Sequence, residues 1–377
     1  MGLRILLATE SFYPAVDGTT TTVKATTDEL LARGHEVAIV APAPGLTTYR
    51  RSRVTRISPL APVAPQVRTA IDSFRPDLVL AVTPATGPRG VGRKALKHTR
   101  ALGLPAVVLQ TSPLPDLTWE YWRTRVAERA DAVVVTASWL ASRFSALGVS
   151  ARTWRPGVDP LAFTPALRDD WLHDHWARAR SASGPQVVVG YVGSLHKRHG
   201  VRSLAALAEV PGIRPVIIGD GPQRDWLAGR LPGAKFTGAL ETGDLTVAMA
   251  SLDVLVHPGE QETCCHALRE AGASGVPVVA PRSGGARDVV VPLETGLLHD
   301  PGDDAALARA VAAVAADSRR GLLGARGREI ALGRDWASAV DELEAHLLEV
   351  AGRVTGPAVR EAATERAEDT IRTPSAE

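Results

Sequence analysis

The feature that most constrains the fold is a regular alternation between short apolar runs and helical patterns. In the first half of the chain these runs have the length of buried strands and span Arg4–Thr9, Glu36–Ala41, Leu78–Thr83, Ala106–Gln110 and Ala132–Thr136. Strands that alternate with helices favour a parallel sheet covered on both faces. Ligands of such sheets bind beyond the carboxyl ends of the strands, so the segments after Thr9, Thr83 and Gln110 are candidate binding segments.

The second half of the chain repeats this alternation. Its strand-like runs span Gln186–Val192, Val216–Ile218, Asp253–His257 and Val276–Ala280. A chain of 377 residues is long for one core and suits two domains. The net charge of +2 does not require a nucleic-acid partner, and we expect none.

Cysteine usage and hydropathy indicate a cytoplasmic protein. The two cysteines, Cys264 and Cys265, are adjacent, so a structural disulfide is not expected and a reducing compartment fits. The apolar run Ile5–Ala8 is too short for a signal peptide. No stretch approaches the ~20 apolar residues that a membrane span needs.

The stretch 257–281 contains a pair of acids at a helical spacing. Glu262 precedes an expected helix, and Glu270 lies about two turns along that helix. The plainest interpretation of such a pair is two surface acids on an amphipathic helix. Carboxylates that flank a helix start also suit a sugar nucleotide, because they can accept hydrogen bonds from sugar hydroxyls.

The start of the same helix is an expected anion site. Thr263 is a good N-cap residue, which would leave the amides of Cys264, Cys265 and His266 at the first turn. Amides at a helix start, together with the positive end of the helix dipole, favour an anion such as a diphosphate.

These residues carry a resemblance to a known family. Glu262, Glu270 and the string ASGVPVVA that follows resemble the donor-site signature of retaining glycosyltransferases of family 4. The longer string QETCCHALREAGASGVPVVAP is most similar to the mannosyltransferase branch. Gly18, after F-Y-P, holds the place of the glycine that approaches the donor phosphates in that family. Gly219 opens a G-D-G-P turn that also resembles the family pattern.

Two departures concern groups that contact the donor. The family turn G-R-L…E-K supplies an arginine and a lysine to the diphosphate, whereas the turn that begins at Gly193 has Ser194 and His199 at those places. Lys197 and Arg198 lie between them and are the expected substitutes, although a bidentate guanidinium cannot be moved freely.

A third departure lies after the strand that ends at Gln110. Many relatives carry a histidine or aspartate there, next to the transferred sugar, but this chain has Thr111 and Ser112. These side chains offer hydroxyl hydrogen bonds at most, and we expect them to contact the acceptor. Trp119 and Trp122 follow and have two alternative roles, flanking an acceptor groove or packing in the core.

An arginine cluster precedes these segments and also has two interpretations. Arg50, Arg51, Arg53 and Arg56 lie in a stretch that reads as a loop. They form either a solvated basic face or a contact with anionic lipid headgroups at the inner face of the membrane.

The resemblance implies an α/β chain of the GT-B type, with two Rossmann-like domains whose parallel sheets face each other across a cleft. Its expected parts are an acceptor domain, a donor domain, a helix that crosses back to the first domain and a disordered tail, spanning 1–165, 166–335, 336–351 and 352–377. The implied reaction moves a hexose, with mannose from GDP-mannose as the first choice, to a glycan or glycolipid hydroxyl with retention of configuration. No cofactor or metal is expected.

The resemblance also assigns roles to residues. Glu270 would hold the ribose hydroxyls of the donor. Glu262 would hold the hexose hydroxyls and stabilise positive charge at the anomeric carbon. The amides of Cys264 and Cys265 would face the diphosphate together with Gly18.

Three other interpretations stay open. A glycoside hydrolase needs two carboxyl groups across one bond, about 5 or 6.5–9.5 Å apart, whereas eight residues of helix rise about 12 Å. A sugar-nucleotide epimerase would share the architecture but lack an acceptor groove. A catalytically impaired relative that binds sugar nucleotides or a partner would explain the loss of the usual cations at Ser194 and His199.

Overall fold

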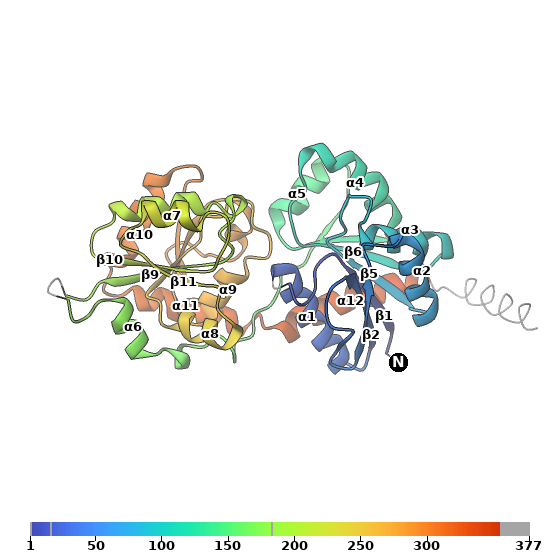
Figure 1. Ribbon diagram of the computed structural model, residues 1–377, viewed down its shortest axis with the longest axis horizontal. Coiled ribbons are helices and arrows are strands. Elements are labelled where there is room, and N and C mark those ends of the chain that lie inside the picture. Colours follow the sequence, from blue (N-terminus) through green and yellow to red (C-terminus); the bar gives the residue numbers. More distant parts are fainter. Residues whose placement is uncertain (1, 16, 182–183, 355–377) are drawn as a thin grey trace, which may run out of the picture. The chain divides into compact units, whose positions relative to one another are not determined.

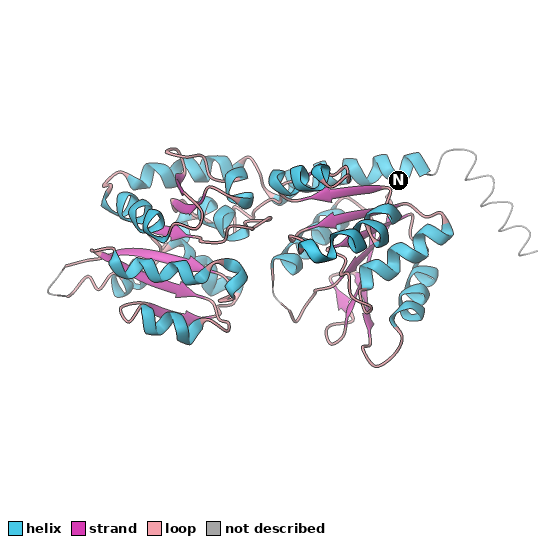
Figure 2. Ribbon diagram, turned by 90° about the horizontal axis from the view of Figure 1, so that it is seen from above, coloured by secondary structure: helices cyan, strands magenta, loops and turns pink. Residues whose placement is uncertain are grey.

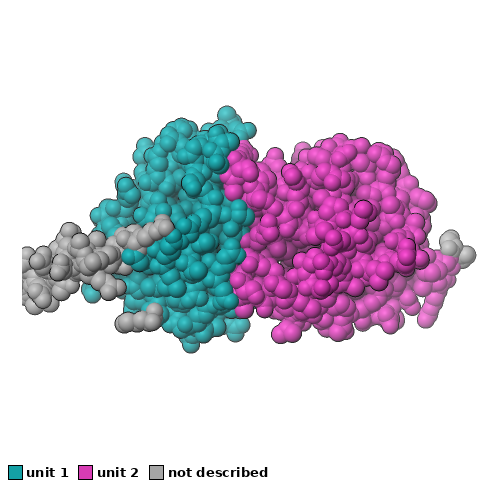
Figure 3. Space-filling view, turned by 180° about the vertical axis from the view of Figure 1, so that it is seen from behind, with its two compact units in different colours: residues 1–135, 144–154, 340–377 teal, residues 136–143, 155–339 magenta. Residues whose placement is uncertain are grey.

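The computed structural model describes residues 2–15, 17–181 and 184–354 of the chain. These residues form two compact units (Figure 3). Each unit is built around its own sheet. Among the described residues, unit 1 takes in 2–15, 17–135, 144–154 and 340–354, and unit 2 takes in 136–143, 155–181 and 184–339.

Unit 1 contains, among its described residues, an eight-stranded sheet in the order β3-β4-β2-β1-β5-β6-β7-β8. Its strands β1, β2, β5 and β6 are labelled in Figure 1. Neighbouring strands are parallel except for the antiparallel pair β3 and β4. Its strands are β1 (Arg4–Thr9), β2 (Glu36–Pro42), β3 (Thr48–Tyr49), β4 (Ser52–Ile57), β5 (Leu78–Val82), β6 (Ala106–Gln110), β7 (Ala132–Val135) and β8 (Arg152–Thr153). The α-helices between them are α1 (Gly18–Ala32), α2 (Val63–Phe74), α3 (Val91–Leu102), α4 (Trp119–Arg125) and α5 (Ser138–Ala146).

Unit 2 contains a six-stranded parallel sheet in the order β11-β10-β9-β12-β13-β14. Its strands are β9 (Val187–Val192), β10 (Ile213–Ile218), β11 (Lys235–Gly238), β12 (Val254–Val256), β13 (Val278–Pro281) and β14 (Gly296–His299). The α-helices are α6 (Asp170–Trp176), α7 (Arg224–Arg230), α8 (Thr242–Ala250), α9 (His266–Ala273), α10 (Asp304–Ala316), α11 (Arg320–Leu332) and α12 (Trp336–Val354), the last of which continues into unit 1. The short 3-10 helices of the chain are η1 (Asp116–Thr118), η2 (Ala127–Arg129), η3 (Pro165–Leu167), η4 (Lys197–His199), η5 (Val201–Glu209) and η6 (Gly284–Asp288).

The strands are apolar on both faces because helices cover both faces of each sheet (Figure 2). In β1, Leu6 and Ala8 pack against α2 through Val67 and Ile71. The intervening side chains of β1 are equally buried on the opposite face. The sequence therefore reads as continuous apolar runs, and the predicted α/β class is confirmed.

Both sheets have the doubly wound order, in which the direction of winding reverses at one point. In unit 1 the reversal lies between β1 and β5, and in unit 2 it lies between β9 and β12. Ligands of open α/β sheets bind at the carboxyl ends of the strands beside such a reversal. The segments that follow β9 and β12 in unit 2, and β1 and β5 in unit 1, are therefore the places to look for a site.

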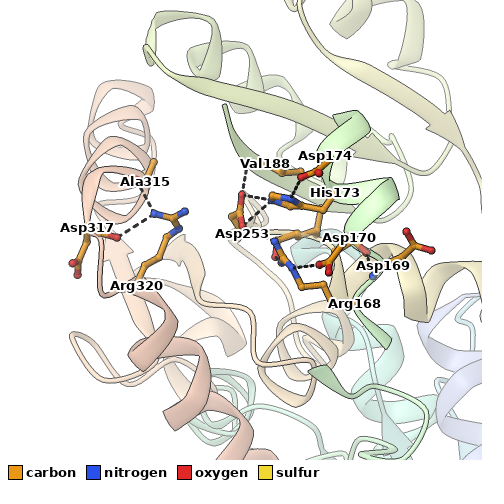
Figure 4. Close-up of polar contacts among 12 residues, drawn as sticks. Arg168, Asp169, Asp170, His173, Asp174, Val188, Asp253, Ala315, Asp317 and Arg320 are labelled. Atoms are coloured by element: carbon orange, nitrogen blue, oxygen red, sulfur yellow. Dashed lines mark hydrogen bonds and ion pairs between the residues drawn. The ribbon is translucent and has the colours of Figure 1, made fainter. Parts of the chain in front are cut away.

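The amino ends of β9 and β12 are joined by one carboxylate (Figure 4). Asp253, just before β12, accepts hydrogen bonds from the Val188 amide at 2.8 Å and from His173 Nε2 at 3.0 Å. Arg168 Nη2 lies 3.3 Å from the same carboxylate. Burial would raise the pKa of Asp253, but these partners outweigh burial and lower the pKa. The carboxylate thus ties α6 to β9 and β12, on the side away from the candidate segments.

Two expectations about local structure are wrong. Arg53 and Arg56 lie on β4 rather than in a loop, because residues 48–57 form a hairpin whose turn contains Arg50 and Arg51. The expected tail begins too early, since residues 352–354 still belong to α12, whose buried Leu347 and Val350 hold the helix against unit 1. The rest of that tail, 355–377, lies outside the described residues.

None of the described helices combines the length and the hydropathy that would be needed to cross a bilayer.

Candidate functional site

The turn after β9 lies against the end of β10. Gly219, which follows β10, has φ +141°, and a Cβ placed on it would lie 1.9 Å from the carbonyl oxygen of Gly193. Only glycine allows the two backbones to approach so closely. The close contact fixes the path of the segment 193–200 as it leaves the sheet.

This segment brings the expected substitute cations to the surface and one imidazole inward. Lys197 and Arg198 are exposed on η4, whereas His199 is partly buried. Arg198 Nε donates to His199 Nε2 at 3.1 Å, and His199 Nδ1 lies 2.7 Å from Glu262 Oε1. Because Nε2 accepts in this arrangement, we assign the ring proton to Nδ1, which donates to the carboxylate.

Residues 257–265, here called the Glu262 loop, follow β12 and hold this carboxylate between two imidazoles. His257 Nε2 lies 3.7 Å from Glu262 Oε1, beyond hydrogen-bonding distance but within the range of an electrostatic contact. Burial would raise the pKa of Glu262, but the His199 and His257 contacts outweigh burial and lower it well below its usual range. The carboxylate is therefore ionised throughout the physiological pH range.

The ring of His257 is itself fixed from the β9 side. It is buried and stacks on Tyr191, with ring centroids 6.2 Å apart and planes within 9°. Tyr191 Oη donates to the Ser194 carbonyl at 3.0 Å. The two segments beside the winding reversal are thus joined through side chains.

The backbone of the Glu262 loop is held in place by two donors. The Glu262 carbonyl accepts the Gly285 amide at 2.7 Å and Trp139 Nε1 at 2.9 Å. A Cβ at Gly285 would lie 2.8 Å from the Thr263 carbonyl oxygen, so the close packing of η6 on the loop requires glycine here. These contacts fix the position of Glu262 independently of any ligand.

The helix after the loop begins later than the sequence predicts. Helix α9 starts at His266, and its N-cap is Cys265 in the left-handed conformation, with φ 52° and no side-chain cap bond. The expected N-cap role of Thr263 is wrong, because the backbone turns once more before the helix starts. Cys264 and Cys265 have buried side chains, and the contact of their amides with a diphosphate stays a prediction.

Glu270 lies on α9 as predicted and is partly buried. Burial raises its pKa from 4.5 to about 7. A carboxyl in this state can both accept and donate hydrogen bonds near neutral pH, which suits contacts to ribose hydroxyls.

The carboxyl edge of the unit 1 sheet carries hydroxyl groups. Thr83 follows β5, Thr111 follows β6, and Thr19 lies in the first turn of α1. The Thr83 and Thr111 hydroxyl oxygens are 2.6 Å apart, and those of Thr111 and Thr19 are 3.2 Å apart. Ser112 is drawn into the same edge, since its carbonyl accepts Gln110 Nε2 at 2.8 Å.

Gly18 is the first residue of α1, and the start of that helix is capped by a carboxylate. Asp17 Oδ1 accepts the Thr20 amide at 2.8 Å, and its other oxygen accepts Ser11 Oγ at 2.7 Å. A carboxylate beside Gly18 disfavours a phosphate at the same amides. The donor role of Gly18 stays a prediction.

Comparison with known proteins identifies the family. A family model described as "Glycosyltransferase Family 4" matches residues 16–160, and one described as "Glycosyl transferases group 1" matches residues 186–317. The GDP-mannose-dependent alpha-mannosyltransferase of Mycolicibacterium smegmatis is 35% identical over 93% of this chain and 98% of its own length. The protein of the same name from Corynebacterium glutamicum is 31% identical over 92% and 89%, respectively. The chain belongs to glycosyltransferase family 4.

Solved structures agree on the fold of this glycosyltransferase. HepE from Anabaena, in complex with UDP and glucose, superposes with a TM-score of 0.75 at 19% identity and covers 92% of this chain and all of its own. WaaG, a glycosyltransferase involved in lipopolysaccharide biosynthesis, superposes with a TM-score of 0.69 at 16% identity, over 93% and 100%. The expected GT-B fold is confirmed.

Trp119 and Trp122 of the glycosyltransferase pack against each other and against Phe144. Trp122 is 0% exposed, and the ring of Trp119 lies 5.6 Å from it and 4.9 Å from Phe144. An acceptor contact through the Trp122 ring is therefore wrong, because core side chains enclose it. The alternative of core packing describes Trp122, whereas Trp119 is half-buried and its contact with an acceptor stays a prediction.

The arginine cluster is partly used inside unit 1. Arg56 donates to the carbonyls of Pro42 and Leu46, and Arg51 donates to the Leu31 carbonyl at the end of α1. Arg50 and Arg53 are exposed and are the candidates for a contact with anionic lipid, although Arg50 Nε also lies 3.4 Å from Asp28 Oδ1. That contact stays a prediction.

Two features of the site escaped sequence reasoning. The contact between His199 and Glu262 joins residues 63 positions apart. His257 lies beside the Glu262 carboxylate, but the sequence pattern identifies it only as the end of a strand. The signal that could have identified both histidines is that each follows a strand next to the winding reversal.

Proposed function

We propose that this glycosyltransferase moves a hexose, mannose from GDP-mannose, to a hydroxyl of a lipid-linked or saccharide acceptor with retention of configuration. The observation that carries the proposal is the carboxyl group of Glu262, held between His199 and His257 on a backbone fixed by Gly285 and Trp139. The curated relatives that match nearly the whole chain are named GDP-mannose-dependent, which supports the choice of donor.

The chemistry follows from fixed charge. Departure of a nucleoside diphosphate leaves positive charge at the anomeric carbon of the hexose, and a preorganised carboxylate stabilises that charge without reorganising. Glu262 has this property because its imidazole partners keep it deprotonated. The exposed side chains of Lys197 and Arg198 supply the positive charge for the departing diphosphate.

The nucleoside end of the donor would lie along α9. Glu270, about two turns from the helix start, would bind the ribose hydroxyls, and the first-turn amides of α9 would face the phosphates. With this assignment, Glu262, the first-turn amides and Glu270 follow one another in the same order as the sugar, the phosphates and the ribose of the donor.

A second candidate function rests on His199. At this position the family has a permanent cation, but His199 donates its ring proton to Glu262 and accepts from Arg198. Such a site fits a catalytically impaired relative that binds a sugar nucleotide and transfers little.

The experiment that decides between the two measures nucleotide release by the purified chain from GDP-mannose, GDP-glucose and UDP-glucose. It is run with water alone and with methyl α-D-mannopyranoside as a soluble acceptor. We expect acceptor-dependent GDP release from GDP-mannose. Glu262→Gln should reduce release by about 10²–10³-fold, the loss typical of one electrostatic group at a transition state.

The matched control is Glu260→Gln. Glu260 lies on the same loop, but its carboxylate accepts the Gly302 amide at 2.7 Å, so release should match the wild type. Equal loss in both variants would contradict the role of Glu262. An inert wild type that gains release through His199→Lys would establish the impaired relative instead.

A further inference from the structure

Three threonine side chains at the carboxyl edge of the unit 1 sheet form a chain of hydroxyls. The oxygens of Thr83 and Thr111 are 2.6 Å apart, and those of Thr111 and Thr19 are 3.2 Å apart. The Thr111 amide also donates to Thr83 Oγ1 at 3.1 Å. We call these residues the threonine chain.

The middle member is engaged on both sides by its neighbours. Thr111 is 7% exposed, and its hydroxyl lies between two other hydroxyls. Its position after β6 is one at which the sequence predicts a hydroxyl contact to the acceptor. In this protein the hydroxyl at that position already forms hydrogen bonds to protein side chains.

We assign the hydrogen bonds a direction that passes the donor capacity outward, since either hydroxyl of each pair can donate. Thr83 Oγ1 accepts an amide hydrogen from Thr111, which polarises its own hydroxyl toward donating to Thr111 Oγ1. Thr111 can then donate to Thr19 Oγ1, and the hydroxyl hydrogen of Thr19 is left for a ligand. Thr19 is partly exposed, in the first turn of α1.

The backbone is strained at the inner end of the threonine chain. Thr83 has φ 47°, a left-handed conformation in which a β-branched residue is an outlier. Its amide is held by the Leu109 carbonyl at 2.8 Å, and its carboxyl-side position next to β5 lies at the winding reversal of the sheet. A strained residue kept at such a place indicates that its side chain is needed in this position.

We propose that Thr19, rather than Thr111, makes the hydroxyl contact to the acceptor at this edge, and that Thr83 is a positioning residue that orients Thr19 through Thr111. The inference rests on the proposed transferase function and adds residues that the sequence comparison does not point to.

The test measures steady-state transfer from GDP-mannose to methyl α-D-mannopyranoside by threonine variants. Thr19→Val should lower kcat/KM for the acceptor about tenfold, as expected for one lost neutral hydrogen bond, and leave the KM for GDP-mannose unchanged. Thr19→Ser keeps the hydroxyl and should restore the rate. Thr83→Val should also lower kcat/KM for the acceptor, and Thr83→Ser should restore it.

Two further variants separate this role from a structural one. Thr21→Val is the matched control, because Thr21 lies on the same helix but its hydroxyl donates to the Asp17 carbonyl. If the hydroxyls act as one chain, Thr19→Val combined with Thr83→Val should cost no more than Thr19→Val alone.

The outcomes distinguish this inference from the proposed function. Transfer by the wild type with equal rates for Thr19→Val and Thr21→Val overturns the role of Thr19. Additive losses in the double variant overturn the positioning role of Thr83. A wild type without transfer removes the proposed function, and the inference falls with it.

Discussion

At the scale of single residues, the site contains two carboxyl groups whose environments separate their proton affinities. His199 and His257 lower the pKa of Glu262, whereas burial raises the pKa of Glu270 to about 7. A pair of acids with opposite shifts is typical of a site in which one group must carry charge and the other need not.

The raised pKa of Glu270 predicts a pH-dependent stability. Between pH 4.5 and about 7 the folded chain keeps a proton that the unfolded chain has released, so this group lowers stability as the pH rises through that window. Glu270→Gln removes the effect. Allowing for solvent screening, the stability of the variant relative to wild type should rise by about 2 kcal/mol from the bottom to the top of the window.

Thermal unfolding at about pH 5 and at about pH 7.5 measures this change. The Tm of Glu270→Gln should gain several degrees on the wild type between the two conditions. Glu294→Gln, at an exposed surface position, is the control and should run parallel to the wild type. Parallel behaviour of Glu270→Gln would show that the Glu270 carboxyl is not desolvated.

Sequence reasoning identified Glu262 and Glu270 because both lie within one continuous string. It could not find the partners of Glu262, since His199 and Trp139 reach it from 63 and 123 positions away. Long-range contacts of this kind depend on the strand order, which the string does not specify.

At the scale of elements, Asp253 predicts where unit 2 is most sensitive. Its carboxylate joins Val188, His173 and Arg168, and Asp253→Ala would leave the buried Val188 amide without its acceptor. We expect a loss of about 2–3 kcal/mol in the free energy of unfolding.

Chemical denaturation, with the unfolding of unit 2 monitored by tryptophan fluorescence, measures this loss in the free energy of unfolding. Asp174→Ala on the same helix is the matched control, because its side chain is 68% exposed, and it should change stability by less than about 0.5 kcal/mol. Equal midpoints for the two variants would contradict the role of Asp253 in joining α6 to the sheet.

Element boundaries were predicted well where apolar runs are buried and poorly where backbone geometry decides. The run Arg4–Thr9 is β1 without change. The sequence predicts too early a start for α9, because Thr263 has a side chain typical of an N-cap residue. In the structure the left-handed Cys265 is the N-cap. The hairpin β3–β4 was missed because its arginines do not form an apolar run.

At the scale of the whole molecule, alternating strands and helices predicted the α/β class, and the family resemblance predicted the GT-B fold. The pattern could not give the order of strands within each sheet. That order places the segments after β9 and β12 side by side in unit 2, and it thereby turns two distant stretches of sequence into one site.

The central claim is that these two segments of unit 2 hold the sugar nucleotide. Hydrogen–deuterium exchange with and without GDP-mannose tests it on the intact chain. We predict slower exchange in peptides that cover residues 193–200 and 257–270, with no change in peptides from α6 at the opposite edge of the sheet. Unchanged exchange in both segments at saturating donor, or protection confined to other parts of the chain, would contradict the account.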